Sequence, residues 1–206
     1  MSKKGYHHGN LRSALVDATL ALIERQGPQG FSLSDAARSV GVTPAAVYRH
    51  FAGRDDLIAE CARQGFDLFA EEMRRAWNDG RPNPLRAFEA VALAYLDFAR
   101  DHPGHYMAMF ESGISLSLNP DLARAHERAL AVFARAAEPL IERLPGDRRP
   151  PAAMFAAHVW ALSHGIVELF ARPGPGSRAP FPPDALLEAG IGIYLRGLGL
   201  VPGDPD

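Results

Sequence analysis

Hydrogen-bonding and cationic side chains gather at one place in this sequence, in Tyr48-Arg49-His50 and again at Arg54. They follow the small residues Ala45 and Ala46 and the pair Thr43-Pro44. Hydroxyl and cationic groups are the usual partners of phosphate oxygens, and small residues allow a helix backbone to lie close to a surface. The order of residue types therefore suits a short helix that enters the major groove of DNA with its flanks on the phosphates.

Local start and stop signals define the elements that would position this cluster. Ser32 can accept a backbone N–H at the start of a helix, and Asp35 can reach back to Ser32 in a short variant of the capping box. Gly41 follows the last apolar position of that helix, where a positive φ favours glycine. Thr43-Pro44 begins a second helix, which we expect to end near His50. This stretch has the layout of a helix-turn-helix, although two short helices around a glycine also occur as ordinary connecting structure.

The charge is distributed unevenly along the chain. Of the 206 residues, 47% are hydrophobic and 22% are charged, as in folded globular proteins. The formal net charge is −2, but residues 1–54 carry +4 and the remainder carries −6. The basic surface is thus confined to the N-terminal part, where the cluster lies. The short basic arm Ser2–Gly9 could lie along an adjacent groove or the phosphates, or could be a disordered start.

The single cysteine and the hydropathy pattern bear on the compartment. Cys61 cannot form an internal disulfide, and its helical spacing from Leu57 and Leu68 favours a buried thiol over a redox sensor. We find no early apolar run of signal-peptide length, and no stretch close to the roughly 18 apolar residues of a membrane span. The sequence therefore predicts a cytoplasmic protein with no membrane partner.

Helical periodicity dominates the chain from end to end, and no segment shows the alternation of a sheet. We expect an all-α fold of about nine helices without an internal repeat. The expected helices are 10–26, 32–40, 44–50, 54–78, 85–100, 104–111, 119–144, 152–171 and 184–199, with a proline- and glycine-rich loop at 172–183. Residues 1–56 would form a three-helix DNA-binding domain and residues 57–206 an effector-binding and dimerisation domain, with the helix 54–78 linking the two.

The first third of the chain resembles the DNA-binding domain of the tetracycline-repressor (TetR) family of transcriptional regulators. The matching residues are the helix Asn10–Gln26 with Gly27, Ser32-Leu33, Ala37, Gly41-Val42-Thr43, Val47-Tyr48-Arg49-His50-Phe51, Arg54 and Leu57. The resemblance implies that the DNA-binding residues are Ser32, Ser34, Arg38, Thr43, Pro44, Ala45, Ala46, Tyr48, Arg49, His50 and Arg54.

Two roles within this set follow from the resemblance. The phosphate contacts would be Thr43, Tyr48, His50 and Arg54, with Ser32 presenting the start of the preceding helix to the backbone. The groove-facing residues would be Arg38, Ala45 and Ala46, whereas Val47 and Phe51, four apart on one face, would be core. Ser34 stands where the family often has a basic residue, which weakens the argument for that one contact.

Trp160-Ala161-Leu162-Ser163-His164-Gly165 resembles the Trp-x-x-x-His-Gly (WHG) motif of one C-terminal domain found among TetR-like regulators. That domain implies a dimer formed by the last two helices and an enclosed small effector. Gly165, Gly190 and Gly197 also leave flat helix faces on which helices can approach closely. A glycine inside a helix costs about 1 kcal/mol relative to alanine, so we expect these three residues at the dimer interface.

Aromatic and methionine side chains are concentrated on the central helices, as in many small-molecule sites. The candidate ligand-binding residues are Tyr95, Tyr106, Phe110, Trp160 and His164. The same set also fits an ordinary core. A buried imidazole needs a partner, which either a ligand or the protein itself can supply.

Three arrangements would suit an enzyme instead, and the first of them, the pair His7-His8, has no third ligand in its neighbourhood and matches the arm of the family. Residues 161–165 mimic a nucleophile elbow, but the elbow needs a strand-to-helix turn and this stretch is helical. His164 and Glu168, four apart, could share a metal, yet the chain lacks the Glu-x-x-His and His-Glu-x-x-His patterns of helical metal sites. We therefore expect no catalytic residue, no metal and no cofactor.

The combined prediction is a homodimeric, sequence-specific transcriptional regulator that acts as a repressor. It would bind a near-palindromic operator in double-stranded DNA and be released by a small, partly apolar effector that changes the arrangement of the helix 54–78. The alternative is a DNA-binding protein that responds to a protein partner rather than to a small molecule.

Overall fold

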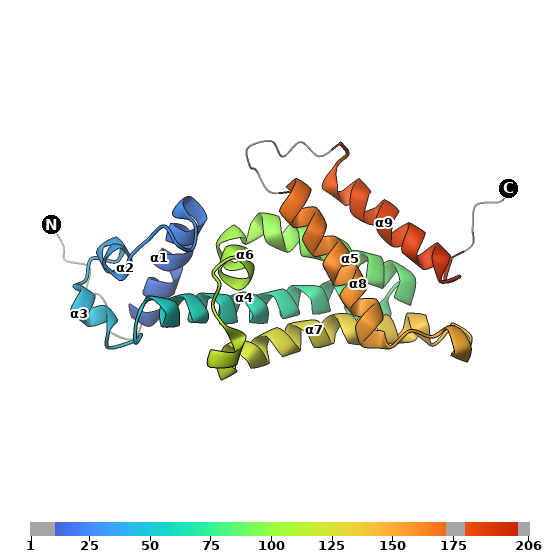
Figure 1. Ribbon diagram of the computed structural model, residues 1–206, viewed down its shortest axis with the longest axis horizontal. Helices are drawn as coiled ribbons and strands as arrows, with labels where there is room; N and C mark the ends of the chain where they lie inside the picture. The colour runs from blue at the N-terminus through green and yellow to red at the C-terminus, as the bar shows by residue number, and fades with distance from the viewer. Residues whose placement is uncertain (1–10, 172–179, 202–206) are drawn as a thin grey trace. The chain divides into compact units, whose positions relative to one another are not determined.

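The computed structural model describes residues 11–171 and 180–201, and within these residues it contains nine α-helices and no strand (Figure 1). The all-α fold that the periodicity predicts is therefore confirmed. The arm Ser2–Gly9 and most of the loop 172–183 lie outside the described residues. The chain divides into two compact units, residues 1–67 with 102–126 and residues 68–101 with 127–206.

The first compact unit holds the helices around the predicted DNA-binding cluster. They are α1 (Leu11–Gln26), α2 (Leu33–Ser39), α3 (Pro44–Val47), the first half of α4 (Arg54–Trp77), α6 (Pro103–Phe110), η3 (Leu116–Leu118) and the start of α7 (Pro120–Ile141). Gly27 after α1 has φ 76° and Gly41 after α2 has φ 74°. Gly41 thus has the positive φ that the sequence predicts, and Gly27 has the same conformation at the end of α1.

The α3 helix is shorter than the sequence predicts. It ends at Val47, and the next three residues form a turn in which the His50 N–H donates to the Val47 carbonyl at 2.9 Å. The Phe51 N–H donates to the same carbonyl at 3.0 Å. Bonds to the third residue back tighten the last turn of a short helix, which is why regular helix stops before Tyr48. Val47 and Phe51 are buried, as expected.

The α6 helix packs within the first unit, which a division of the chain at residue 56 does not anticipate. A Cβ on Gly104 would lie 2.8 Å from the carbonyl oxygen of Leu20 in α1. A Cβ on Gly65 in α4 would lie 2.7 Å from Sδ of Met109 in α6. Glycine at these two positions lets α6 approach α1 and α4 more closely than any other residue would.

Cys61 lies in the core of the same unit. Burial raises the pKa of its thiol, which keeps the sulfur protonated and unreactive. The prediction of a buried structural thiol is therefore confirmed.

The second compact unit surrounds a cluster of aromatic rings. Its elements are the remaining parts of α4 and α7, η2 (Asn78–Gly80), α5 (Pro84–Asp101), η4 (Gly146–Arg148), α8 (Ala152–Ile166), the π-helical turn η5 (Val167–Ala171) and α9 (Pro183–Gly197). The ring of Phe69 lies 5.0 Å from that of Phe98, 5.2 Å from Tyr95 and 5.3 Å from Trp160, measured between centroids. These edge-to-face contacts join α4, α5 and α8.

One stretch of this unit corrects an expectation from the sequence. Residues 152–171, which span α8 and η5, have a mean hydropathy of 1.3 over 20 residues. By length and composition alone this stretch is sufficient to cross a membrane, although the sequence analysis anticipated none. One side of α8 packs on α5 and α9 within the unit. The apolar character is explained there, but several small apolar residues on the outer side of α8 remain exposed.

Candidate nucleic-acid interface

The start of α2 is fixed by the capping box that the sequence predicts. The Asp35 N–H donates to Oγ of Ser32 at 3.2 Å, and the Ser32 N–H donates to Oδ2 of Asp35 at 2.9 Å. Hydrogen bonds from the side chain and backbone of Ser32 lower the pKa of Asp35, so this carboxylate stays ionised at the helix N-terminus. It also forms an ion pair of 2.8 Å with Arg38. The side chains of Ser32 and Arg38 are therefore partly engaged within α2.

Thr43 and Pro44 begin α3 as predicted, with Thr43 at the N-cap in an extended conformation. The Thr43 side chain makes no capping hydrogen bond. Pro44 has no N–H, and the Ala46 N–H donates to the Thr43 carbonyl at 2.9 Å, so the Ala45 N–H is the group at this helix start that an uncapped Thr43 leaves for an outside acceptor.

Most of the predicted DNA-binding residues lie on the surface of the α2–α3 region. The exposed ones are Ser32, Ser34, Arg38, Thr43, Pro44, Ala45, Tyr48 and Arg49, and the half-buried ones are Ala46, His50 and Arg54. Tyr48 is 61% exposed, which is unusual for a large aromatic residue. The phenol of Tyr48 is presented beside a guanidinium, that of Arg49, immediately after α3.

A hollow of 410 Å³ opens beside this region. It is lined by Leu11, Val40, Gly41, Val42, Ala46, Arg49 and His50. Leu11, at the start of α1, therefore lies at the same hollow as the turn between α2 and α3 and as Ala46 of α3.

Arg54, which the sequence analysis predicts as a phosphate contact, has hydrogen-bond partners within the first compact unit. Its Nε donates to the Phe31 carbonyl at 3.0 Å and its Nη2 donates to the Pro28 carbonyl. The guanidinium also stacks over the Phe31 ring at 4.9 Å, and the side chain is only 24% exposed. Arg54 therefore connects the start of α4 to the loop before α2, because buried carbonyls need a donor that the sequence alone does not locate.

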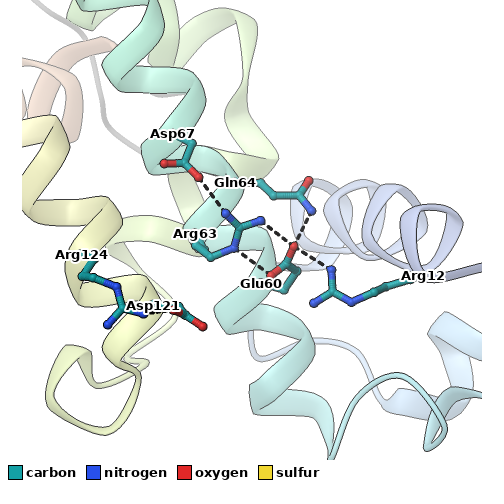
Figure 2. A network of polar contacts seen from close by, with 7 residues as sticks. All are labelled: Arg12, Glu60, Arg63, Gln64, Asp67, Asp121 and Arg124. Atoms are coloured by element: carbon teal, nitrogen blue, oxygen red, sulfur yellow. Dashed lines mark hydrogen bonds and ion pairs between the residues drawn. The ribbon is translucent and has the colours of Figure 1, made fainter.

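Arg12 makes a second connection of the same kind, which the sequence analysis missed. Its guanidinium lies over the ring of Phe51 at 5.0 Å. It also donates to Oε1 of Glu60 in α4 at 2.9 Å (Figure 2). The sequence signal was an arginine at the start of α1 together with an acid on the inner side of α4, a pattern too common to identify a contact.

The five predicted ligand-binding residues are divided between the two compact units. Tyr106 and Phe110 belong to the first unit, where their rings lie 4.9 Å apart and Phe110 contacts Phe66 at 5.7 Å. They are part of the packing of α6 on α4. Tyr95, Trp160 and His164 lie together in the second unit, and the Tyr95 hydroxyl is 2.9 Å from Nδ1 of His164. The imidazole of His164 thus has a protein partner.

A second hollow, of 360 Å³, lies between α7 and α8 in the second unit. It is lined by Glu127, Leu130, Ala131, Phe133, Ala134, Ala153, Ala156, Ala157 and Trp160. Trp160 is the one member of the predicted ligand-binding set among these residues. The lining is apolar apart from the Glu127 carboxylate, so this hollow suits an apolar molecule.

The three glycines predicted at a dimer interface have different surroundings. A Cβ on Gly190 would lie 2.8 Å from Cδ2 of Leu162 in α8. The packing of α9 on α8 within one chain therefore accounts for Gly190. A Cβ on Gly165 or Gly197 would meet no atom within 4 Å, so these two positions remain open to another molecule.

Two short helices around a glycine turn, with hydroxyl, phenol and guanidinium groups exposed beside the second helix, define the helix-turn-helix class. Residues 15–61 match the family model described as bacterial regulatory proteins, tetR family. Residues 88–194, slightly more than half of the chain, match the model for the tetracyclin repressor-like C-terminal domain. The chain belongs to the tetracycline-repressor (TetR) family. Neither match specifies the WHG subtype, which remains a prediction.

Individual relatives show the same likeness. An uncharacterised regulator of the helix-turn-helix type, YobS of Bacillus subtilis, is 29% identical over 100 residues, which are 48% of this chain and 51% of YobS. The aligned part thus spans about half the length of this curated relative. A protein of unknown function from Rhodococcus sp. RHA1 is 27% identical with a TM-score of 0.79, over 95% of this chain and 98% of that one. AibR, solved in complex with isovaleryl coenzyme A and operator DNA, is 16% identical with a TM-score of 0.68, over 89% and 97%.

Proposed function

We propose that the chain is a DNA-binding transcriptional repressor whose α3 helix reads the major groove of a near-palindromic operator. The observation that carries the proposal is the exposed surface at the end of α3, where Tyr48 and Arg49 are presented and Thr43 leaves the helix start without a side-chain cap. The fold shared with AibR, which binds operator DNA, supports it. Such a regulator acts in the cytoplasm and needs no catalytic residue.

The proposed DNA-contacting set follows from this surface. Phosphate contacts are assigned to Thr43, Tyr48, Arg49 and His50, and groove-facing positions to Ala45 and Ala46, with Arg38 and Ser34 at the edge. Arg54 is removed from the set because its donors serve the carbonyls of the first unit.

We further propose that two copies pair through α8 and α9. The outer side of α8 exposes Met154, Ala157, His158 and Ala161, a helical stripe of apolar and small residues around one imidazole. Ile193 on α9 is 65% exposed and lies four residues before the open position Gly197. Exposed apolar residues on two neighbouring helices are typical of an interface rather than of a solvated surface. A dimer also explains the membrane-like composition of α8 without a membrane.

The proposed effector is a small, partly apolar molecule. The hollow between α7 and α8 provides an apolar site of 360 Å³ with Trp160 in its lining, and Tyr95 and His164 lie behind that ring. The α4 and α7 helices contribute residues to both compact units. A ligand that changes the packing of α7 is therefore able to alter the helices of the first unit and release DNA.

The test is selection of bound fragments from random DNA, followed by a salt titration of the selected site. Tyr48→Ala should weaken binding to all sequences by about 1–2 kcal/mol, since a phosphate contact positions the protein without specifying a base. Tyr48→Phe should show how much of that loss belongs to the hydroxyl. Arg143→Ala, which removes an exposed cation near the end of α7, serves as the control and should bind normally. Failure of the wild-type protein to enrich any sequence would disprove the proposal.

A further inference from the structure

The buried Glu60 carboxylate is the centre of a polar network at the edge of the first compact unit. It accepts four hydrogen bonds from three side chains, and it is only 8% exposed (Figure 2). Arg63 binds it with two donors, Nε at 2.9 Å and Nη2 at 2.8 Å, and Gln64 donates at 2.7 Å. The fourth donor is Arg12 of α1, at 2.9 Å. Three of the four bonds come from α4 itself, so Arg12 supplies the link to another helix.

The Arg63 bonds alone are sufficient to neutralise Glu60 and to satisfy both of its oxygens. Arg63 also holds Asp67 at 2.7 Å, which fixes the guanidinium on the surface of α4. Hydrogen bonds from Arg63 and then from Arg12 and Gln64 lower the pKa of Glu60 in spite of its burial. Arg63 and Gln64, both on α4, thus hold the carboxylate in its ionised form and in a fixed position without a contribution from α1. The carboxylate provides a fixed anionic point on α4.

Arg12 lies between this point and the end of the α3 region. Its guanidinium contacts the carboxylate of Glu60 and the ring of Phe51. Phe51 is buried and its N–H donates to the carbonyl of Val47, the last residue of α3. Arg12 is therefore one link between the turn after α3 and α4; another is the Ala52 N–H, which donates to Oδ2 of Asp56 in α4 at 2.8 Å.

The neighbour of Arg12 lies beside the same region. Leu11 lines the hollow formed with the α2–α3 turn, Ala46 and Arg49. The bond from Arg12 to Glu60 restrains the first turn of α1, and with it the Leu11 side chain at this hollow.

We propose that Glu60 is a positioning residue for DNA recognition: through Arg12 it holds the first turn of α1 and Phe51 in the register that presents α3 to the groove. This inference rests on the proposed function, because it concerns the orientation of the same helix. Glu60 itself touches no DNA in this arrangement, since it is enclosed by Arg12, Arg63 and Gln64.

A positioning role and simple electrostatics predict opposite changes in operator affinity when the Glu60 carboxylate is removed. Removal of one carboxylate from a DNA-binding surface reduces its repulsion of phosphate, so charge alone predicts tighter binding. If Glu60 is a positioning residue, its removal should weaken binding to the selected operator. The same removal should leave binding to unrelated DNA unchanged or slightly tighter.

The experiment measures operator and non-operator affinity of the full chain at several salt concentrations. Glu60→Gln should weaken operator binding roughly tenfold, the size expected from one lost charge-assisted hydrogen bond, without a change in the salt slope. Glu24→Gln is the matched control, because Glu24 is exposed on α1 and its loss changes the net charge equally. The control should bind the operator at least as tightly as the wild type. Equal or tighter operator binding by a folded Glu60→Gln protein overturns the proposal.

A second variant keeps the proposal testable if Glu60→Gln does not fold. Arg12 is 50% exposed, so Arg12→Gln is expected to fold. It should reproduce the loss of operator affinity without lowering the salt slope, and Arg12→Lys should recover part of it. Where both single variants fold, the double variant should bind no more weakly than Arg12→Gln alone, since Arg12→Gln already removes the bond to Glu60. A slope lowered by about one in Arg12→Gln would instead identify Arg12 as a phosphate contact and contradict the proposal.

If the wild-type protein selects no operator, the proposed function is disproved, and the positioning role of Glu60 is disproved with it. A wild-type protein that binds an operator, together with a Glu60→Gln variant that binds it equally well, disproves only the positioning role.

Discussion

Arginine side chains in the first unit lie in two different environments that their sequence positions do not reveal. Arg49 is exposed beside Tyr48, whereas Arg12 and Arg54 each lie over a phenylalanine ring and donate to buried acceptors. A guanidinium offers five donors and a flat face, so it fits both a phosphate and a ring with a carbonyl. Which of these partners a given guanidinium binds depends on which acceptors the fold buries near it. At Arg54 these acceptors are the carbonyls of Phe31 and Pro28.

Arg54→Ala should therefore lower stability rather than the salt dependence of DNA binding. The substitution leaves the two carbonyls without their donor and should reduce the free energy of unfolding by about 1–3 kcal/mol. Denaturant unfolding measures this loss, and a salt titration of operator binding should give the wild-type slope. Arg49→Ala is the comparison and should reduce the slope by about one while leaving stability nearly unchanged. If Arg54→Ala is as stable as the wild type and has the lower slope, Arg54 contacts phosphate after all.

At the scale of elements, the sequence predicts the helix boundaries that depend on neighbouring residues. The Ser32–Asp35 capping box and the positive φ of Gly41 depend on residues a few positions apart, and the structure confirms both. Packing between distant segments is a different matter. The close approach of Gly104 to Leu20 joins residues 84 positions apart, and nothing in either local pattern indicates it.

The difference between local patterns and the packing of distant segments also explains which parts of the candidate sites the sequence predicts. The exposed residues from Thr43 to Arg49 follow from helix boundaries, which are local. The partner of His164 is Tyr95, on a helix that periodicity identifies but does not place. Tyr106 and Phe110 were grouped with Trp160 on aromatic content, and the fold assigns them to another unit. Residue type alone cannot separate two aromatic clusters.

The contact of α9 with α8 gives a testable case of such packing. Gly190→Leu should destabilise the chain by about 1–3 kcal/mol, because the new side chain overlaps that of Leu162. Leu162→Ala in the same chain opens space, so the double variant should lose less stability than the two single losses added together. Denaturant unfolding of the two single variants and the double variant gives this coupling. Strictly additive losses would show that Gly190 does not pack on Leu162.

At the scale of the whole molecule, the distribution of charge and apolar surface separates two tasks. The first 54 residues carry +4 and include the α2–α3 surface, whereas the remaining residues carry −6. Exposed apolar side chains on α8 and α9, such as Met154 and Ile193, belong to this acidic remainder. DNA phosphates repel an acidic surface, so these exposed apolar side chains are not expected to contact DNA. The proposed pairing of two copies would bury these side chains and would place one copy on each half-site of the proposed operator.

Ile193→Glu should therefore convert a dimer into monomers, because burial of an unpaired carboxylate in an interface is strongly unfavourable. Sedimentation velocity at micromolar concentration measures the assembly. Operator affinity should fall by about 10²–10⁴, since two linked half-site contacts become independent. Leu118→Glu is the matched control: Leu118 is 80% exposed in the first unit, and the same change there should leave the dimer intact. A wild-type protein that sediments as a monomer, or that partitions into membranes through the apolar stretch of α8, would contradict the pairing, as would an Ile193→Glu protein that remains dimeric.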